Sequence, residues 1–344
     1  MKKDIKSLSL KELKEEMTLL NEKPFRAKQI YEWIHVKLVR SFDEMTNLSK
    51  ETRKKLEENF TFTNLKVVDS LTSKDESTSK FLFELEDHRV IESVLMKYHH
   101  GNSVCISSQV GCRMGCKFCA STLGGLERNL LPGEMLDQIY QIQRISGERV
   151  SNIVIMGTGE PMDNFDNVIK FLDMISNEDG LNISQRNITV STCGLVERIR
   201  ELADHKLAIT LAISLHAPTD ERRKEIMPVA NKYTIKEIID ACRYYYEQTG
   251  RRITFEYSLI QCVNDQPEQA KILSSLVKGL NCHINLIPVN PIKERDFKQT
   301  QSKYVQNFKN LLEKNRIPVS IRREMGSDIN AACGQLRKSY TDKL

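Results

Sequence analysis

The spacing of apolar residues changes along the chain and separates a helical stretch from a strand-rich one. Residues 1–60 repeat apolar positions at helical spacing, and Ser9 followed by Glu12 is a capping box that predicts the start of a helix. Further helices are predicted from Pro24 onward and over Lys50–Glu58. The first 60 residues are therefore expected to form a small helical module.

The next stretch has the two-residue period of strands. KFLFELE alternates apolar and polar positions, and Asp87-His88 separates it from the apolar run RVIESVLMKY. This pattern predicts a β-hairpin.

From residue 103 onward, short apolar runs alternate with helical stretches. Strands are predicted at SVCIS, NIVIMG, NITVST, LAITLAIS, ITFEYSLI and HINLIP, with a further short one at PVSIR. Helices are predicted between them at Met135–Ser146, Asn164–Ser176, Ile235–Gln248, Glu268–Val277 and Tyr304–Lys314. This order indicates parallel strands, in either a doubly wound sheet or a (β/α) barrel. Six or seven units favour a barrel, an incomplete one included, with its chemistry at the C-terminal ends of the strands.

Composition and charge narrow the class of protein. The 344 residues are 40% hydrophobic and 28% charged, which is typical of a soluble globular protein. The net charge of +5 permits a polyanionic partner without requiring one. We find no apolar run of about 18 residues that would cross a membrane and no secretory signal. We expect a cytoplasmic protein, in which nine cysteines remain available for metals or chemistry.

Four cysteines gather in the stretch CISSQVGCRMGCKFC. Cys112, Cys116 and Cys119 have C-x3-C-x2-C spacing on a glycine-containing loop, so their thiolates can converge on one metal centre. Tetrahedral zinc would need a fourth ligand, for which Cys105 is a candidate inside a predicted strand. Three cysteines instead suit a [4Fe–4S] cluster with one iron left open.

Polar residues follow the predicted strands at the points where a barrel would gather them. MGTGEP places the Glu160 carboxylate after the second strand, where it can hold an ammonium group, although an ordinary tight turn explains the motif equally well. The other strand-end candidates are Ser191, Ser214, Leu215, His216 and Asn290. Cys333, among small residues near the C-terminus, is either a small core residue or a reactive thiol. Cys193 has only its proximity to a strand end in its favour.

Several basic residues are candidates for phosphate contacts, although an ordinary solvated surface charge is the simpler interpretation of each. They are Lys37, Arg40, Arg128, Arg222, Arg223, Arg322 and Arg323.

The cysteine spacing, with Phe118 before the last cysteine, resembles the radical S-adenosylmethionine (SAM) superfamily. Together with CISSQVGC, MGTGEP, ITVSTCG, ISLHAP, NLIPVNP and SDINAACGQL, it makes nearly the whole chain resemble the RlmN/Cfr family of RNA adenine methyltransferases. GEP and the ending REMGSDINAACGQL resemble the RlmN branch of that family.

The resemblance implies an α/β fold with an incomplete (β/α)6 TIM-like barrel. It divides the chain into a helical RNA-binding accessory domain (1–60), a β-hairpin linker (61–97), a radical SAM core (98–328) and a C-terminal segment (329–344). Cys112, Cys116 and Cys119 would hold a [4Fe–4S] cluster. The SAM pocket would consist of Phe118, Gly159, Glu160, Ser191, Ser214, Leu215, His216 and Asn290. Cys333 would carry the methyl group, Cys105 would be the resolving thiol, and Glu92 would be the base.

The implied reaction is methylation of adenosine C2 through an S-methylcysteine, with two SAM molecules used per turnover. The implied substrates are position 2503 of 23S rRNA and position 37 of tRNA, with an electron donor such as flavodoxin and a monomeric enzyme. The implied pair of Cys105 and Cys333 would form a transient disulfide. Two alternatives stay open: C8 methylation of the same rRNA adenosine, giving antibiotic resistance, and a zinc-stabilised RNA-binding protein without catalysis.

Overall fold

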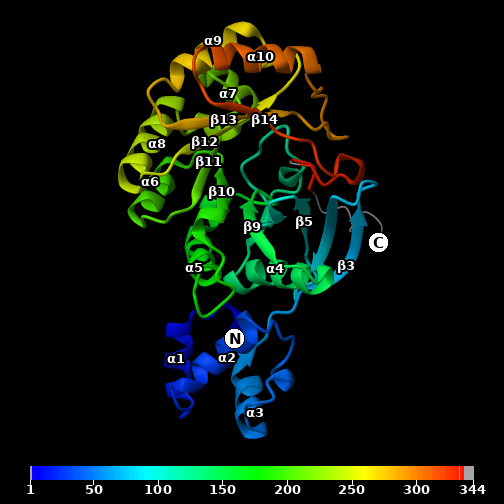
Figure 1. Ribbon diagram of the computed structural model, residues 1–344, viewed down its shortest axis with the longest axis vertical. Helices are drawn as coiled ribbons and strands as arrows, with labels where there is room; N and C mark the ends of the chain where they lie inside the picture. Colours follow the sequence, from blue (N-terminus) through cyan, green and yellow to red (C-terminus); the bar gives the residue numbers. More distant parts are fainter. Residues whose placement is uncertain (1, 333, 337–344) are drawn as a thin grey trace.

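The computed structural model describes residues 2–332 and 334–336. Figure 1 shows a small helical part, which contains the N-terminus, next to a larger part built around a sheet. None of the helices in these residues has the length and apolar character needed to cross a membrane.

The small part, here called the N-terminal module, consists of three helices and one pair of short parallel strands. The helices are α1 (Leu10–Leu19), α2 (Phe25–His35) and α3 (Lys50–Asn59), and β1 (Lys3–Asp4) pairs with β2 (Phe60–Thr61). The predicted capping box is present, because the Ser9 hydroxyl accepts from the Glu12 amide and the Glu12 carboxylate accepts from the Ser9 amide. The three predicted helices are thus confirmed.

The larger part is organised by one ten-stranded sheet with the order β14-β13-β12-β11-β10-β9-β6-β5-β4-β3. Seven neighbouring strands are parallel: β6 (Gly101–Cys105), β9 (Val150–Ile155), β10 (Ile188–Thr192), β11 (Thr210–Ser214), β12 (Ile253–Leu259), β13 (Cys282–Pro288) and β14 (Val319–Ile321). Three antiparallel strands extend the sheet beyond β6: β3 (Lys66–Thr72), β4 (Thr78–Glu84) and β5 (Val90–Tyr98). Strands β14 and β3 form its two edges.

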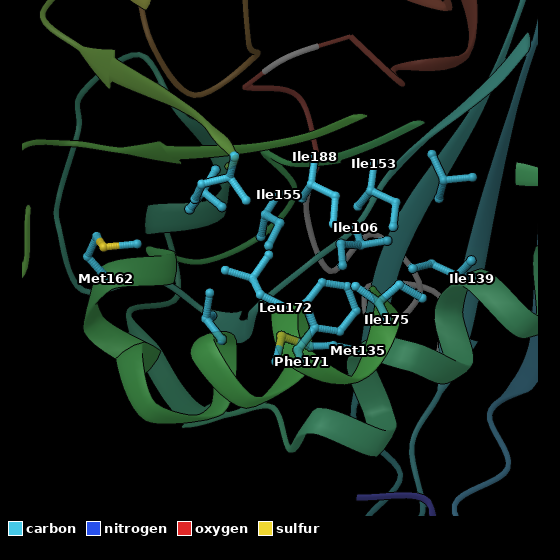
Figure 2. Packing of buried hydrophobic residues seen from close by; sticks show 14 of the residues in the cluster. Ile106, Met135, Ile139, Ile153, Ile155, Met162, Phe171, Leu172, Ile175 and Ile188 are labelled. Atoms are coloured by element: carbon cyan, nitrogen blue, oxygen red, sulfur yellow. The ribbon is translucent and has the colours of Figure 1, made fainter. Parts of the chain in front are cut away.

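Helices follow the parallel strands and cover the sheet. They are α4 (Pro132–Ser146), α5 (Phe165–Ile175), α6 (Val196–Asp204), α7 (Asp220–Ile226), α8 (Ile235–Thr249), α9 (Pro267–Leu276) and α10 (Ser302–Lys314). A separate antiparallel pair, β7 (Gln109–Gly111) and β8 (Leu126–Asn129), encloses the cysteine loop. Figure 2 shows strand residues such as Ile153 and Ile188 packed against Met135 of α4 and Phe171 of α5. Each fully buried side chain of this size contributes roughly 1.5–3 kcal/mol.

The predicted fold class is confirmed, since parallel strands alternating with helices form a partial TIM-like barrel. Every predicted strand is present within a few residues, and the predicted hairpin forms with His88 in a left-handed conformation at its turn (φ 63°). The pattern did not indicate β3, α6 or α7. Strand β3 is an exposed edge strand, and α7 is short and highly charged, so neither carries a long apolar run.

Candidate active site

A pocket lies at the C-terminal ends of the parallel strands, where the sequence predicts the chemistry. Ten of the predicted site residues line it: Cys112, Cys116, Phe118, Cys119, Gly159, Glu160, Ser191, Ser214, His216 and Asn290. Leu215 instead packs in the hydrophobic core. The residues come from the cysteine loop and from the ends of four strands, β9, β10, β11 and β13, so the fold gathers groups from Cys112 to Asn290 that are far apart in sequence.

The cysteine loop is held by backbone contacts on both sides. The Cys112 amide donates to the Gly125 carbonyl at 2.8 Å, and the Lys117 amide donates to the Ile226 carbonyl, at the end of α7, at 2.9 Å. Gly111 has φ 74°, and a Cβ atom there would lie 2.0 Å from the Gly125 oxygen. Only glycine fits this close approach between the two strands of the β7–β8 pair.

The chemistry of the cysteine thiols fits a metal centre. Burial raises the pKa of Cys112 to about 12 and that of Cys116 well above its usual value, and the neighbouring thiols and Glu160 raise both further. The thiols alone would therefore stay protonated, whereas a cationic metal centre stabilises thiolates. Within the described ranges, no three His, Cys, Asp or Glu side chains are arranged to hold a single ion. The three thiols of a cluster bind different irons, so they lie farther apart than the ligands of one ion.

Glu160 presents a buried carboxylate to the pocket. Its oxygens accept from the Met162 amide at 3.1 Å and the Cys193 amide at 2.8 Å. Burial raises the pKa of Glu160, while these amide donors lower it. A Cβ atom on Gly159, which has φ 108°, would lie 2.6 Å from the Gln109 Cβ, so this turn requires glycine. The glycine turn thus fixes a carboxylate in a position where a bound ammonium group would neutralise its negative charge.

His216 lines the pocket as a neutral ring. It adopts a left-handed conformation (φ 56°), and its Nδ1 accepts from the Ser258 amide at 2.9 Å, which leaves the ring proton on Nε2. Burial, together with the charge of Arg223, lowers the pKa of His216 to about 3. The ring of Phe118 meets the imidazole edge to face, with 4.8 Å between the centroids. These two rings form an apolar wall next to the cysteine loop.

A second pocket adjoins the first and contains Cys105. Cys105 lies there with Met96, Ala331 and Ala332. The two pockets share lining residues, namely Met156, Ile287, Asn290, Arg322 and Leu336. Cys105 is thus separate from the other three cysteines of its stretch but opens toward the same space. The described residues contain no group of three His, Cys, Asp or Glu side chains that could hold one metal ion, so they give no support to Cys105 as the fourth ligand of a zinc site.

The predicted methyl carrier, Cys333, lies outside the described residues, but the chain just after it contacts residues next to the cysteine loop. The Ala120 amide donates to the Gly334 carbonyl at 2.8 Å, and the Ser121 hydroxyl donates to the Leu336 carbonyl at 2.9 Å. The C-terminal segment therefore packs next to the cluster side of the pocket.

Glu92, the predicted base, is buried in β5 and does not line the first or the second pocket. Its carboxylate lies 3.4 Å from the Lys80 ammonium, and Lys80 also donates to the Asn330 carbonyl at 3.3 Å. Glu92 lines a third cavity with Val110 and Ser121, behind the cysteine loop. Lys80 thus connects the predicted base with the C-terminal segment.

Comparisons with known proteins agree with this geometry. Residues 3–62 match the family model of the ribosomal RNA large subunit methyltransferase N-terminal domain, and residues 106–273 match that of the radical SAM superfamily. The probable dual-specificity RNA methyltransferase RlmN of Lachnoclostridium phytofermentans is 68% identical, over 99% of this chain and 96% of that protein. The chain belongs to the RlmN family.

Two further relatives extend the agreement. The RlmN of Clostridium novyi is 58% identical over 98% of both chains. A crystal structure of a radical SAM methyltransferase from Sphaerobacter thermophilus superposes with a TM-score of 0.94 at 41% identity, over 98% of this chain and 99% of that one. The predicted family resemblance is thus confirmed, and membership in the radical SAM superfamily implies a [4Fe–4S] cluster and SAM as cofactors.

The structure also assigns pocket residues of this RlmN-family chain that the sequence did not single out. Glu256 of β12 is buried in the pocket, accepts from the Asn285 side chain at 2.9 Å and lies 3.9 Å from the Arg322 guanidinium. Burial raises the pKa of Glu256, and Arg322 opposes this effect. The sequence offered one signal for this residue, namely a carboxylate within the strand ITFEYSLI, which is rich in apolar residues. Cys193 also lines the pocket, beside Glu160.

One prediction about the basic residues is wrong. Arg223 is completely buried, so it is neither a solvated surface charge nor accessible to a phosphate. The neighbouring Arg222 is exposed and pairs with Glu225 at 2.9 Å, as expected for a surface charge.

Proposed function

We propose that this protein is a radical SAM methyltransferase that methylates C2 of adenosine at position 2503 of 23S rRNA and at position 37 of tRNA. The observation that carries the proposal is the gathering of ten predicted residues in one pocket at the strand ends, with the Cys105 thiol next to it. The names of the RlmN relatives, which describe dual-specificity RNA methyltransferases, support the substrate class.

In this proposal, Cys112, Cys116 and Cys119 hold the cluster. When bound, the cluster and SAM supply the one-electron chemistry that an unreactive adenine C2–H requires. Glu160 would bind the amino group of SAM, because its carboxylate is fixed by the Met162 and Cys193 amides. The remaining pocket residues would enclose SAM: Phe118, Gly159, Ser191, Ser214, His216 and Asn290, with Leu215 contributing backbone only.

The protein's own thiols and carboxylate would perform the later steps. Cys333 would carry the methyl group as a thioether that becomes joined to adenine C2. Glu92 would then take the C2 proton, with Lys80 as its counter-charge at 3.4 Å. The Cys105 thiolate would attack the Cys333 sulfur, so that a disulfide forms and the sulfur–carbon bond breaks. The electron pair of that bond would stay on the RNA-bound carbon, which would take up a proton to become the methyl group of the released RNA. A thiol reductant would restore both cysteines.

The decisive experiment is anaerobic reconstitution followed by incubation with SAM, a reductant and transcripts of the two RNA targets. Mass spectrometry is expected to find 2-methyladenosine. A product methylated at C8 would replace this proposal with the resistance activity, and a colourless protein with one zinc per chain would exclude both. The Cys116→Ser variant should lose iron and activity together. The Cys262→Ser variant, altered at an exposed cysteine, should keep both.

Substitution of the resolving thiol tests the order of the steps. The Cys105→Ala variant should accumulate RNA covalently bound to protein, because nothing would attack the Cys333 sulfur. Denaturing gel electrophoresis with labelled RNA detects this species, and the Cys333→Ala variant should give neither adduct nor product. Normal turnover by Cys105→Ala would refute its role.

The N-terminal module is proposed to bind RNA, since its residues match a domain named for ribosomal RNA methyltransferases. We propose that the whole chain divides into four parts: an accessory domain (1–60), a hairpin linker (61–97), a radical SAM core (98–328) and a carrier segment (329–344). A flavodoxin-like electron donor and a monomeric state complete the proposal.

A further inference from the structure

Arg223 is a buried cation next to the pocket, and no carboxylate among the described residues forms an ion pair with it. It lies on α7, and its side chain is completely buried. Its Nε donates to the Leu215 carbonyl at 3.2 Å, and its Nη2 donates to the carbonyls of Cys193 and Ser214. Its Nη1 is buried and has no hydrogen-bond partner among the described residues. All its partners are therefore neutral carbonyl groups.

No carboxylate within the described ranges lies within 4.0 Å of this guanidinium. Asp220, one turn earlier on α7, acts on it only at longer range, and the Asp220 carboxylate accepts from the Ile235 amide at 2.7 Å. A buried ion without a counter-charge costs several kcal/mol even after relaxation. Carbonyl dipoles reduce this cost but do not neutralise the charge. The cost is offset if an anion occupies the adjacent space.

The groups nearest to the charge identify that anion. The Arg223 Nη2 donates to the Cys193 carbonyl, and Cys193 packs in the same buried group of side chains as Cys116, one of the three proposed cluster ligands. The main chain connects the same elements, since the Lys117 amide donates to the Ile226 carbonyl on the last residue of α7. Three thiolates around an oxidised [4Fe–4S] core leave one net negative charge, and reduction by one electron adds a second. The buried cation thus faces a centre whose negative charge grows on reduction.

We propose that Arg223 is the counter-charge of the cluster and a positioning residue for the SAM pocket. As a counter-charge it stabilises the reduced cluster more than the oxidised one and so raises the reduction potential. As a positioning residue it ties the end of β10, at Cys193, to the end of β11, at Ser214 and Leu215. The Cys193 amide in turn holds Glu160, so the same contacts fix the pocket carboxylate.

The inference rests on the proposed function, since it requires a cluster at the three cysteines. The test uses full-length protein reconstituted anaerobically and a redox titration followed by electron paramagnetic resonance. The variants are Arg223→Gln, which removes the charge, and Arg223→Lys, which keeps the charge but not the three carbonyl contacts. Arg222→Gln, on the exposed side of the same helix, is the matched control.

We expect Arg223→Gln to lower the reduction potential by at least 59 mV, which is a tenfold change in the one-electron equilibrium. Arg223→Lys should stay within half of that shift, and Arg222→Gln should match the wild type. Equal potentials for Arg223→Gln and wild type would overturn the counter-charge. A shift in Arg223→Lys as large as in Arg223→Gln would overturn it too. Where Arg223→Gln cannot be reconstituted, a potential lowered by 59 mV or more in Arg223→Lys would overturn it.

Thermal unfolding provides a second readout that does not depend on redox chemistry. In the wild type, cluster insertion supplies the missing anion, so it should raise the melting temperature more than it does in Arg223→Gln. An equal rise in melting temperature in both proteins would show that Arg223 only holds the strand ends together and does not balance the charge of the cluster. A wild-type preparation that takes up no iron or sulfide would instead refute the proposed function.

Discussion

Two buried cations at different places in the molecule have opposite surroundings. Lys6 of the N-terminal module pairs with Asp137 of α4 at 2.7 Å, and both side chains are completely buried. The other Asp137 oxygen accepts from the Leu65 amide at 2.7 Å and the Gln141 side chain at 3.2 Å. Arg223, at the ends of β10 and β11, has only carbonyl partners.

The difference separates a structural charge from one that depends on a ligand. The Lys6–Asp137 pair is neutralised by the protein itself, so it joins the N-terminal module to the barrel in every state of the enzyme. In our proposal, Arg223 is neutralised only when the neighbouring pocket holds an anion. The strand ends are therefore the region whose electrostatics change on cofactor binding, and the module junction is the region whose electrostatics do not.

The largest effect on stability is expected at the module junction. Lys6→Met leaves the Asp137 carboxylate buried without its main counter-charge, and Arg144 at 3.5 Å compensates only in part. The free energy of unfolding should fall by roughly 3–5 kcal/mol, as for other buried pairs that lose one partner. Urea denaturation of the reconstituted protein measures it, and the cluster potential should not change.

Two controls sharpen this result. Lys3→Met removes an exposed lysine that pairs with Glu16, so it should change stability by no more than about 0.5 kcal/mol. The double variant Lys6→Met/Asp137→Leu removes both charges and should recover most of the loss. Wild-type stability in Lys6→Met would mean that the junction does not depend on the pair.

At the strand ends, Glu160→Gln should affect ligand binding more than folding. The Met162 and Cys193 amides donate to different Glu160 oxygens, so glutamine keeps one of these contacts and loses the other, and it carries no charge for the SAM amino group. Loss of a charge-assisted contact of roughly 1.5–3 kcal/mol predicts SAM binding weakened about 10- to 150-fold. Equilibrium dialysis with labelled SAM measures this.

Glu201→Gln, at an exposed carboxylate paired with Arg198, should bind SAM like the wild type. The iron content of both variants should be normal. Unchanged affinity in Glu160→Gln would remove Glu160 from the SAM site.

The sequence predicted the regions of the molecule that follow a periodic rule. Strands of a parallel sheet are buried on both faces, so their apolar runs are visible, and the residues that follow them must gather at one end. This logic placed Glu160, Ser191 and His216 in one pocket. The sequence likewise placed Cys105 inside a predicted strand, apart from the loop of the other three cysteines, and it lines the neighbouring pocket.

The buried charged residues could not be predicted from the sequence, because the segments that cover them in the fold are distant in sequence. Arg223 lies in the polar run TDERRKE, whose composition is that of an exposed helix, and only the packing of α7 between the strand ends and the cysteine loop encloses it. Lys6 is similar, since its partner is 131 positions away in sequence. Glu256 was missed because its local signal, a carboxylate within a strand rich in apolar residues, does not show which side of the strand faces a pocket.

A smaller effect should appear in both regions as acid sensitivity. His35 at the module junction and His216 at the strand ends each have their pKa lowered from 6.5 to about 3, mainly by burial. The folded protein therefore keeps both rings neutral as the pH falls, whereas the unfolded chain takes up protons below pH 6.5. Stability is thus lost between about pH 6.5 and pH 3. Between pH 6 and pH 5, the expected loss is about 1.2 kcal/mol for each ring.

Urea denaturation at pH 6 and pH 5 measures how much each histidine contributes to this loss of stability. The variants are His35→Gln, His216→Gln and the double variant. Each single variant should lose less stability over this interval than the wild type, and the double variant least, because glutamine does not titrate. The exposed His88 provides the control: His88→Gln should follow the wild-type curve, since the His88 side chain is 85% exposed. If His35→Gln flattens the dependence and His216→Gln does not, the strand ends must open to solvent in mild acid while the module junction stays closed.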